Sequence, residues 1–312
     1  MHSGHHAIFE RFTRSAPFDD ERCHHNFMGA RIAHAFERDF NDVVSLADPD
    51  QFKGLKASGR SATYDADPTY PDRNSEDYFE WVDLLTAIDR AVGSFSMIEL
   101  GAGYGRWIAN AAAALRRHQG APLSAHLVGV EASQARFDLM ATNCALNEIP
   151  DMGVERIRAA CTPDGRPVFM GVNDDYGSAV VTDEKVLALF DGAPTDQIMV
   201  EDEVGKKFQI EKVPGLRLTE LIRGPVDFID FDIQGAEVDV VPSAIETLNA
   251  FVKLAHVGTH SFAADARVAA TFHLHGWRPL HMFPSGSLNQ TPYGAFQFID
   301  GIQSWENPRL LG

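Results

Sequence analysis

The chain has 312 residues, of which 45% are hydrophobic and 23% charged, with 21 Phe and 4 Trp. This composition indicates a soluble protein with a sizeable core, and it excludes collagen-like, coiled-coil and wholly disordered chains. The 44 acidic and 27 basic residues give a net charge of −17, which would repel a phosphate backbone, so we expect no nucleic acid partner.

The cysteines and the first residues of the chain indicate the cellular location. The three cysteines, Cys23, Cys144 and Cys161, are far apart and form no CxxC pair, so neither a disulfide framework nor a cysteine zinc site is expected. The opening residues, MHSGHHAIFERF, contain no apolar stretch, and no 18 apolar residues run together. The sequence therefore predicts neither a signal peptide nor a membrane partner, and it favours a cytoplasmic location.

The first part of the chain carries the weaker pattern. Apolar residues at helical spacing predict a helix over 25–44, and a turn-rich stretch follows at 66–77. Ser75 is a suitable N-cap for a helix over 76–92. Because nothing before residue 75 follows the pattern of the rest, we interpret 1–75 as a helical and irregular addition that could support a homo-oligomer.

Strands and helices alternate from residue 94 onward. The expected strands are 94–100, 125–131, 153–160, 226–232, 251–258, 277–283 and 294–300, the last two as a closing hairpin pair; the expected helices are 107–118, 133–148, 236–249 and 263–276. This order predicts an α/β fold with a doubly wound, mostly parallel sheet of seven strands and an antiparallel last strand. We expect the domain to span 76–303, with an insertion at about 162–225 and a tail at 304–312.

A glycine-rich turn and an acid stand at the ends of the first two strands. Gly101, Gly103 and Gly105 alternate between a strand and a helix, which lets the backbone turn tightly and approach a ligand. Glu131 ends the next strand, where a carboxylate can accept both hydroxyls of a ribose, and Ala132 follows it. Each feature alone has a structural explanation, but together they predict a nucleoside site.

The glycine spacing and Glu99 favour one kind of nucleoside. Dinucleotide-binding sites have GxGxxG, whereas this chain has GxGxG with Glu99 two residues before the first glycine. A carboxylate there would repel a pyrophosphate and suit a cationic amino acid group. The arrangement resembles the first motif of class I S-adenosylmethionine-dependent methyltransferases, with Glu131 in the place of their ribose-binding acid. We therefore expect S-adenosyl-L-methionine as cofactor, with Tyr104 and Asp230 among its contacts.

A third stretch resembles one family more closely. Residues 226–237, VDFIDFDIQGAE, are similar to the D-[VI]-[EQ]-G-A-E signature of FkbM-type methyltransferases. Asn143, Asn147, the loop at 173–178 and the stretch 213–222 agree with that family. The resemblance covers about residues 94–260 and implies a Rossmann-like domain. It departs at Asp230, where the family commonly has a lysine.

What the resemblance implies is methyl transfer to a hydroxyl oxygen of a small molecule or sugar. The enzyme must position that oxygen, remove its proton and exclude water. Candidate bases are Asp230, Asp232, His256 and His260, all near the carboxyl ends of strands. We favour His260, because it follows its strand and is less enclosed, although either histidine alone is more often a packed rim residue.

Several alternatives stay open at this point. Asp230, Asp232 and one of His256 or His260 could bind Mg²⁺, although no ligand spacing requires a metal. A nicotinamide-dependent oxidoreductase on a similar sheet, or a non-catalytic binding protein with the methyltransferase fold, would share some of these features. The acidic residues concentrate in and beside the N-terminal addition and the insertion, which favours a neutral or cationic acceptor over a phosphorylated one.

Overall fold

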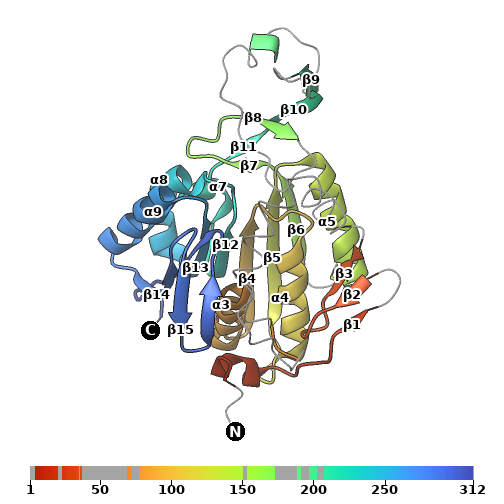
Figure 1. Ribbon diagram of the computed structural model, residues 1–312, viewed down its shortest axis with the longest axis vertical. Coiled ribbons are helices and arrows are strands. Elements are labelled where there is room, and N and C mark those ends of the chain that lie inside the picture. Colours follow the sequence, from red (N-terminus) through yellow and green to blue (C-terminus); the bar gives the residue numbers. More distant parts are fainter. Residues whose placement is uncertain are drawn as a thin grey trace.

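The structure is a computed structural model that describes residues 4–19, 23–34, 36, 69–71, 77–149, 153–172, 188–190, 197–201 and 207–311. The predicted N-cap Ser75 and the whole loop at 173–178 lie outside the described residues. Within them, the centre of the molecule is one mixed sheet with helices on both sides (Figure 1).

Seven strands form this sheet, as the alternation predicts. Their spatial order is β14 (Arg278–Phe283), β17 (Gly301–Glu306), β13 (Val252–Thr259), β12 (Val226–Phe231), β4 (Ser94–Leu100), β5 (Ser124–Glu131) and β6 (Val154–Arg158). Neighbours from β13 to β6 pair in parallel, whereas β17 runs antiparallel to both β13 and β14. The predicted Rossmann-like α/β fold, with its antiparallel last strand, is confirmed.

Two helical layers cover the sheet. On one face, α3 (Asp77–Arg90), α4 (Arg106–Arg117) and α5 (Gln134–Leu146) enclose one apolar cluster. On the other, α7 (Leu218–Leu221), α8 (Glu237–Phe251) and α9 (Phe262–Leu274) enclose a second. All six residues of β12 are buried, as expected for a central strand covered on both faces. The strand order reverses between β4 and β12, and in such sheets ligands bind at the carboxyl ends beside that reversal.

The N-terminal addition departs from the predicted helix over 25–44. Besides a short 3₁₀ helix, η1 (Ala7–Arg11), it contains a three-stranded sheet of β1 (Phe18–Asp19), β2 (Cys23–His25) and β3 (Arg31–Ala33). The helix is therefore wrong over 25–33, and most of 34–44 lies outside the described residues. The cause is Asn26, whose side-chain oxygen accepts from the amides of Met28 and Ala30 and closes a turn that includes Gly29 at φ +76°.

Aromatic residues attach this addition to the domain. Phe9 packs edge-on against Phe27 and Tyr78, with ring centroids 5.9 and 5.5 Å apart. Phe27 also contacts Trp81 of α3 at 4.7 Å. Phe9, Phe27, Tyr78 and Trp81 thus pack against one another within one chain.

The insertion leaves the sheet at the carboxyl end of β6. It contains β7 (Ala160–Cys161), β8 (Val168–Val172), η3 (Ala188–Phe190), β9 (Gln197–Glu201), β10 (Lys207–Val213) and β11 (Gly215–Leu216). The antiparallel sheet β8-β10-β9 projects from one end of the molecule, opposite the end where the N-terminus lies (Figure 1). The described residues of this part form short strands, as expected, together with the short helical segments η3 and α7.

The closing hairpin differs from the prediction. The partner of β14 is β17 at 301–306, while β16 (Gly294–Gln297) pairs with β15 (Leu288–Thr291) in a separate two-stranded sheet. Phe296 and Phe298, which suggested a sheet strand, instead pack against Phe79 of α3. The domain end placed at 303 is therefore too early, because β17 runs to Glu306. No described helix has the length and apolar character needed to cross a membrane.

Candidate active site

The three alternating glycines have different roles. All adopt positive φ, at +81° for Gly101, +54° for Gly103 and +74° for Gly105. A Cβ on Gly101 would collide with the carbonyl oxygen of Asp232, and one on Gly105 would come within 2.7 Å of Met140 Cγ. A Cβ on Gly103 would meet nothing within 4 Å. The outer glycines thus permit close packing, whereas Gly103 borders open space in which a ligand can approach the backbone.

Glu99 has a structural role in addition to the one predicted. Its side chain is 3% exposed, and its carboxyl oxygens accept from the amides of Trp107 and Ile108 at 3.3 and 3.0 Å. These amides belong to the first turn of α4, which has no intrahelical partners for them. Burial, and then the nearby Asp230, raise the pKa of Glu99 well above its usual value. Glu99 therefore caps α4, and its contact with a cofactor amine stays a prediction.

Glu131 lies beside the glycine turn, as the sequence predicts. Its Oε2 accepts from the amide of Gly103 at 2.7 Å, and its Oε1 accepts from the amide of Ser133 at 2.7 Å. Burial raises the pKa of Glu131 even though these amides oppose the shift. Ala132, directly after it, is half-buried. The structure thus brings the open glycine and the strand-end carboxylate together.

Tyr104 contributes its backbone to this turn. Its ring packs against Phe36, with centroids 5.2 Å apart, and is nearly buried. The Asn143 side-chain amide donates to the carbonyls of Tyr104 and Gly105, both at 3.1 Å. Asn147 in turn exchanges two hydrogen bonds of 2.8 Å with the backbone of Arg31. The two asparagines that support the family resemblance thus brace the glycine turn and dock the N-terminal sheet.

A row of polar side chains crosses the sheet one to three residues before the strands end. Asp230 is paired in register with Glu99 and His256, and Ser304 with His256 and His281. Residues in register lie on one face of a sheet, here the face covered by α3. We call Glu99, Asp230, His256, Ser304 and His281 the polar row. Five adjacent strands therefore present polar groups to one helix.

Two acidic residues of α3 meet the polar row. Asp83, which is 1% exposed, accepts from His256 Nδ1 at 2.7 Å and from the Ser304 hydroxyl. Glu80 shares a hydrogen bond with Asp230, and burial together with Asp230 raises the pKa of Glu80 well above its usual value. Burial also raises the pKa of Asp230, to about 6. The Glu80–Asp230 pair therefore retains a proton at mildly acidic pH.

His256 is the better placed of the two candidate histidines to act as a base. Because Nδ1 donates to Asp83, the neutral ring keeps its lone pair on Nε2. No hydrogen bond to Nε2 is found among the described residues, and the His256 side chain is 4% exposed. Burial acts to lower the pKa of His256, but Asp83 and the neighbouring carboxylates raise it on balance.

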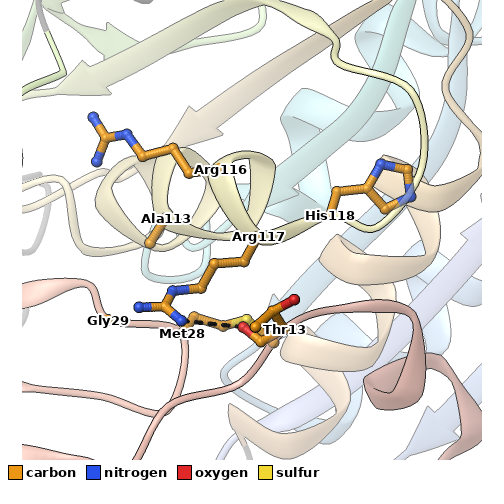
Figure 2. A pocket seen from close by; sticks show the side chains of 7 residues that line it. All are labelled: Thr13, Met28, Gly29, Ala113, Arg116, Arg117 and His118. Atoms are coloured by element: carbon orange, nitrogen blue, oxygen red, sulfur yellow. Dashed lines mark hydrogen bonds between the residues drawn. The ribbon is translucent and has the colours of Figure 1, made fainter.

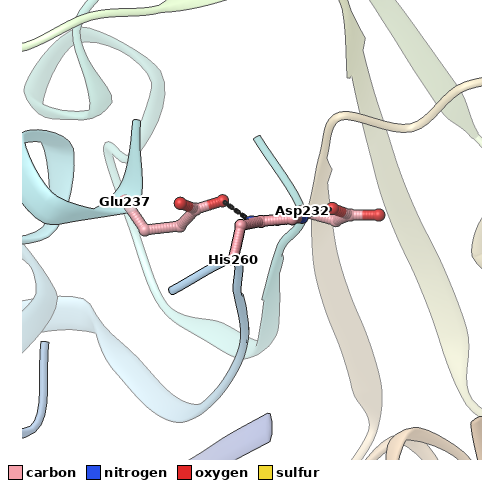
Figure 3. Close-up of side chains that lie close together, drawn as sticks. All are labelled: Asp232, Glu237 and His260. Atoms are coloured by element: carbon pink, nitrogen blue, oxygen red, sulfur yellow. Dashed lines mark ion pairs between the residues drawn. The ribbon is translucent and has the colours of Figure 1, made fainter. Parts of the chain in front are cut away.

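His260 lies between two carboxyl groups, with Asp232 at the end of β12 and Glu237 at the start of α8 (Figure 3). Its Nε2 is 3.3 Å from Asp232 Oδ1, and its Nδ1 is 3.7 Å from Glu237 Oε1. Burial opposes protonation, but the two carboxyl groups raise the pKa of His260 to about 10. The raised pKa favours the protonated ring, so His260 as the base stays a prediction that this arrangement does not support.

The residues considered for Mg²⁺ divide between two places. Asp230 and His256 belong to the polar row under α3, whereas Asp232 and His260 lie at the rim with Glu237. Asp232 is half exposed, and its backbone carbonyl packs on Gly101. The described residues therefore do not bring Asp230, Asp232 and one of the two histidines together as the predicted Mg²⁺ set.

A separate cavity of about 430 Å³ lies at the other end of α4 (Figure 2). Residues of α4 and of the N-terminal addition line it, including Arg117, which donates to the carbonyl of Thr13 at 3.2 Å. Because a helix rises 1.5 Å per residue, the twelve residues of α4 place this end roughly 18 Å from the glycine turn. The cavity is therefore not part of the site at the carboxyl ends.

Comparison of the sequence with known proteins identifies the kind of chemistry. No protein-family model matches the chain. A curated protein of Jannaschia sp. (strain CCS1), described as "Putative methyltransferase", is 23% identical over 240 residues, which cover 75% of this chain and 80% of that protein. The chain resembles methyltransferases. The resemblance predicted from the glycine turn, Glu131 and residues 226–237 is thus confirmed at that level.

Solved methyltransferase structures also match, at low similarity. Methyltransferase FkbM from Methylobacillus flagellatus KT is 12% identical with a TM-score of 0.39, over 68% of this chain but 44% of its own. The N-terminal domain of human METTL16 in complex with SAH is 10% identical with a TM-score of 0.38, and the match covers 74% of this chain and 68% of that chain. A precorrin-6y C5,15-methyltransferase from Geobacter metallireducens GS-15 is 9% identical with a TM-score of 0.37, and the match covers 71% of this chain and 86% of that chain. The strand order, rather than these scores, carries the assignment of the fold.

Proposed function

We propose that the protein is an S-adenosylmethionine-dependent O-methyltransferase that acts on a hydroxyl group of a small molecule or sugar. The observation that carries the proposal is the open backbone at Gly103 beside the carboxylate of Glu131. These two features fit a nucleoside, with the ribose hydroxyls toward Glu131 and the chain of the cofactor along the glycine turn. The similarity to a methyltransferase supports the same cofactor.

The start of α4 disfavours a dinucleotide. A pyrophosphate binds at the free amides of a helix N-terminus. Here the amides of Trp107 and Ile108 are already bonded to the buried Glu99. An S-adenosylmethionine molecule has no phosphate and does not need these amides. The alternative of a nicotinamide-dependent oxidoreductase therefore has less support.

The cofactor, when bound, supplies an electrophilic methyl group on a sulfonium. The acceptor oxygen forms a bond to the methyl carbon as the carbon–sulfur bond breaks, and the bonding pair leaves with sulfur. The acceptor proton must go to a base, and we assign it to Nε2 of His256. Asp83 acts through His256, because its hydrogen bond fixes the tautomer and stabilises the imidazolium that forms.

The charge of the polar row bears on the acceptor. Asp230, Asp83 and the proton-sharing Glu80 surround His256 with carboxyl groups. A phosphorylated acceptor would be repelled here, whereas hydroxyl groups can donate to these oxygens. We therefore infer a neutral or cationic acceptor with more than one hydroxyl group.

The proposal is tested by supplying methyl-labelled S-adenosylmethionine with a panel of sugars and hydroxylated natural products, and with matched amines. The expected product is a methyl ether, and its formation falls by at least a hundredfold in His256→Gln. The variant should still bind S-adenosylhomocysteine as the wild type does. N-methylation of the amines with no ether product, or full turnover by His256→Gln, contradicts the proposal.

A further inference from the structure

Asp232, Glu237 and His260, which we call the rim cluster, contain buried polar atoms that the protein leaves unpaired. Glu237 is 0% exposed; its Oε1 accepts from the amide of Ile233 at 2.8 Å, but its Oε2 has no hydrogen-bond partner among the described residues. Within the same part of the chain, His260 Nδ1 is also buried without a hydrogen bond. A buried polar atom without a partner costs about 1–3 kcal/mol, so each such atom needs an explanation.

The geometry of the rim cluster fits a bound cation. One ligand atom from each of its three residues lies within 4.8 Å of the other two. Donor atoms that bind one ion at about 2.0–2.2 Å lie roughly 3–4.4 Å apart, which is close to this arrangement. Glu237 begins α8, and Asp232 and His260 directly follow the paired strands β12 and β13. The donors are therefore positioned at the ends of three regular elements.

The surrounding charge also favours a cation. Two carboxyl groups, those of Asp232 and Glu237, face the single imidazole of His260 at 3.3 and 3.7 Å. Even a protonated ring would not balance them, because it carries one positive charge.

We propose that the rim cluster binds one divalent transition-metal ion, of the Mn²⁺ or Zn²⁺ class, through one oxygen each of Asp232 and Glu237 and one ring nitrogen of His260. Imidazole is a poor ligand for Mg²⁺ and Ca²⁺ but a good one for these ions. With Asp232 half exposed, the remaining coordination positions open toward solvent at the rim. An acceptor oxygen could occupy one of them; that use rests on the proposed function, whereas the metal site does not.

The test is a titration of Mn²⁺ into chelator-treated protein, followed by electron paramagnetic resonance of the free ion. Mn²⁺ is the probe because the histidines near the N-terminus would themselves attract Zn²⁺. The wild type should bind one Mn²⁺ per chain, and Glu237→Gln and Asp232→Asn should each weaken binding at least tenfold. Glu246→Gln, on the same helix and 83% exposed, is the matched control and should bind as the wild type does.

Failure of this proposal can be separated from failure of the proposed function. If the wild type binds S-adenosylhomocysteine but no Mn²⁺, or if both rim variants bind Mn²⁺ as tightly as the wild type, the metal site is refuted. If the wild type binds Mn²⁺ but does not bind S-adenosylhomocysteine, the result instead contradicts the proposed methyltransferase function. If Glu237→Gln does not fold, Asp232→Asn decides the matter, because its side chain is half exposed.

Discussion

Replacing Asp230 by asparagine should make the folded protein more stable at neutral pH. Asp230 is 2% exposed and lies in the polar row between Glu99 and His256, with Glu80 against it. Burial disfavours the ionised form and raises the pKa of Asp230 from 3.8 to about 6. An asparagine of almost the same shape carries no charge to be disfavoured.

The magnitude follows from the two pKa values. Each pH unit of difference between the folded and unfolded pKa is worth about 1.4 kcal/mol, so the ionised Asp230 costs the folded state about 3 kcal/mol. Because the folded pKa is the higher one, the folded protein holds the proton more tightly. Stability is therefore lost as pH rises through the window from 3.8 to about 6, and the cost is constant above it.

The assay is urea unfolding of wild type and Asp230→Asn between pH 4.5 and 7.5. The advantage of the variant should grow from about 1 kcal/mol at pH 4.5 to about 3 kcal/mol at pH 7.5. Asp239→Asn, an exposed site on α8, should change stability by less than about 0.5 kcal/mol at either pH. The reasoning is refuted if Asp230→Asn is no more stable than wild type at pH 7.5, or if its advantage does not depend on pH.

Two further predictions concern the glycine turn and the base. Gly101→Ala should cost more than about 4 kcal/mol or prevent folding, because its Cβ would overlap the carbonyl of Asp232. Gly103→Ala should lower the free energy of unfolding by only about 1–2 kcal/mol, because of its positive φ, but it should weaken S-adenosylhomocysteine binding at least tenfold. If the two substitutions destabilise the protein equally, the roles assigned to Gly101 and Gly103 are wrong. Asp83→Asn should lower the pKa of His256, measured by NMR titration of the ring, while cofactor affinity is kept; an unchanged pKa would show that Asp83 does not act on His256.

The sheet could be predicted because its strands are short apolar runs that alternate with helices. The last strand was predicted at the wrong place because it is not an apolar run. The stretch 294–300 is rich in Phe, whereas β17 contains Gln303, Ser304 and Glu306, which are buried but polar. Glu306 is tolerated there because Arg90 and Arg278 pair with it. Such partners come from distant elements and leave no local pattern.

The parts of the site that are formed by residues close together in the sequence could be predicted. The glycine turn, Glu131 and the asparagines of α5 follow from motifs at strand and helix ends. The choice between His256 and His260 could not be predicted from such motifs, because it depends on Asp83, which lies 173 residues before His256 in the sequence. Glu237 was part of a recognised signature, but its burial against His260 depends on how α8 packs on β13.

The most direct test of the account is calorimetric titration of S-adenosylhomocysteine and of NAD into wild type and Glu131→Ala. The account predicts micromolar binding of S-adenosylhomocysteine to the wild type, at least tenfold weaker binding to Glu131→Ala, and no binding of NAD. Binding of NAD without binding of S-adenosylhomocysteine would contradict it.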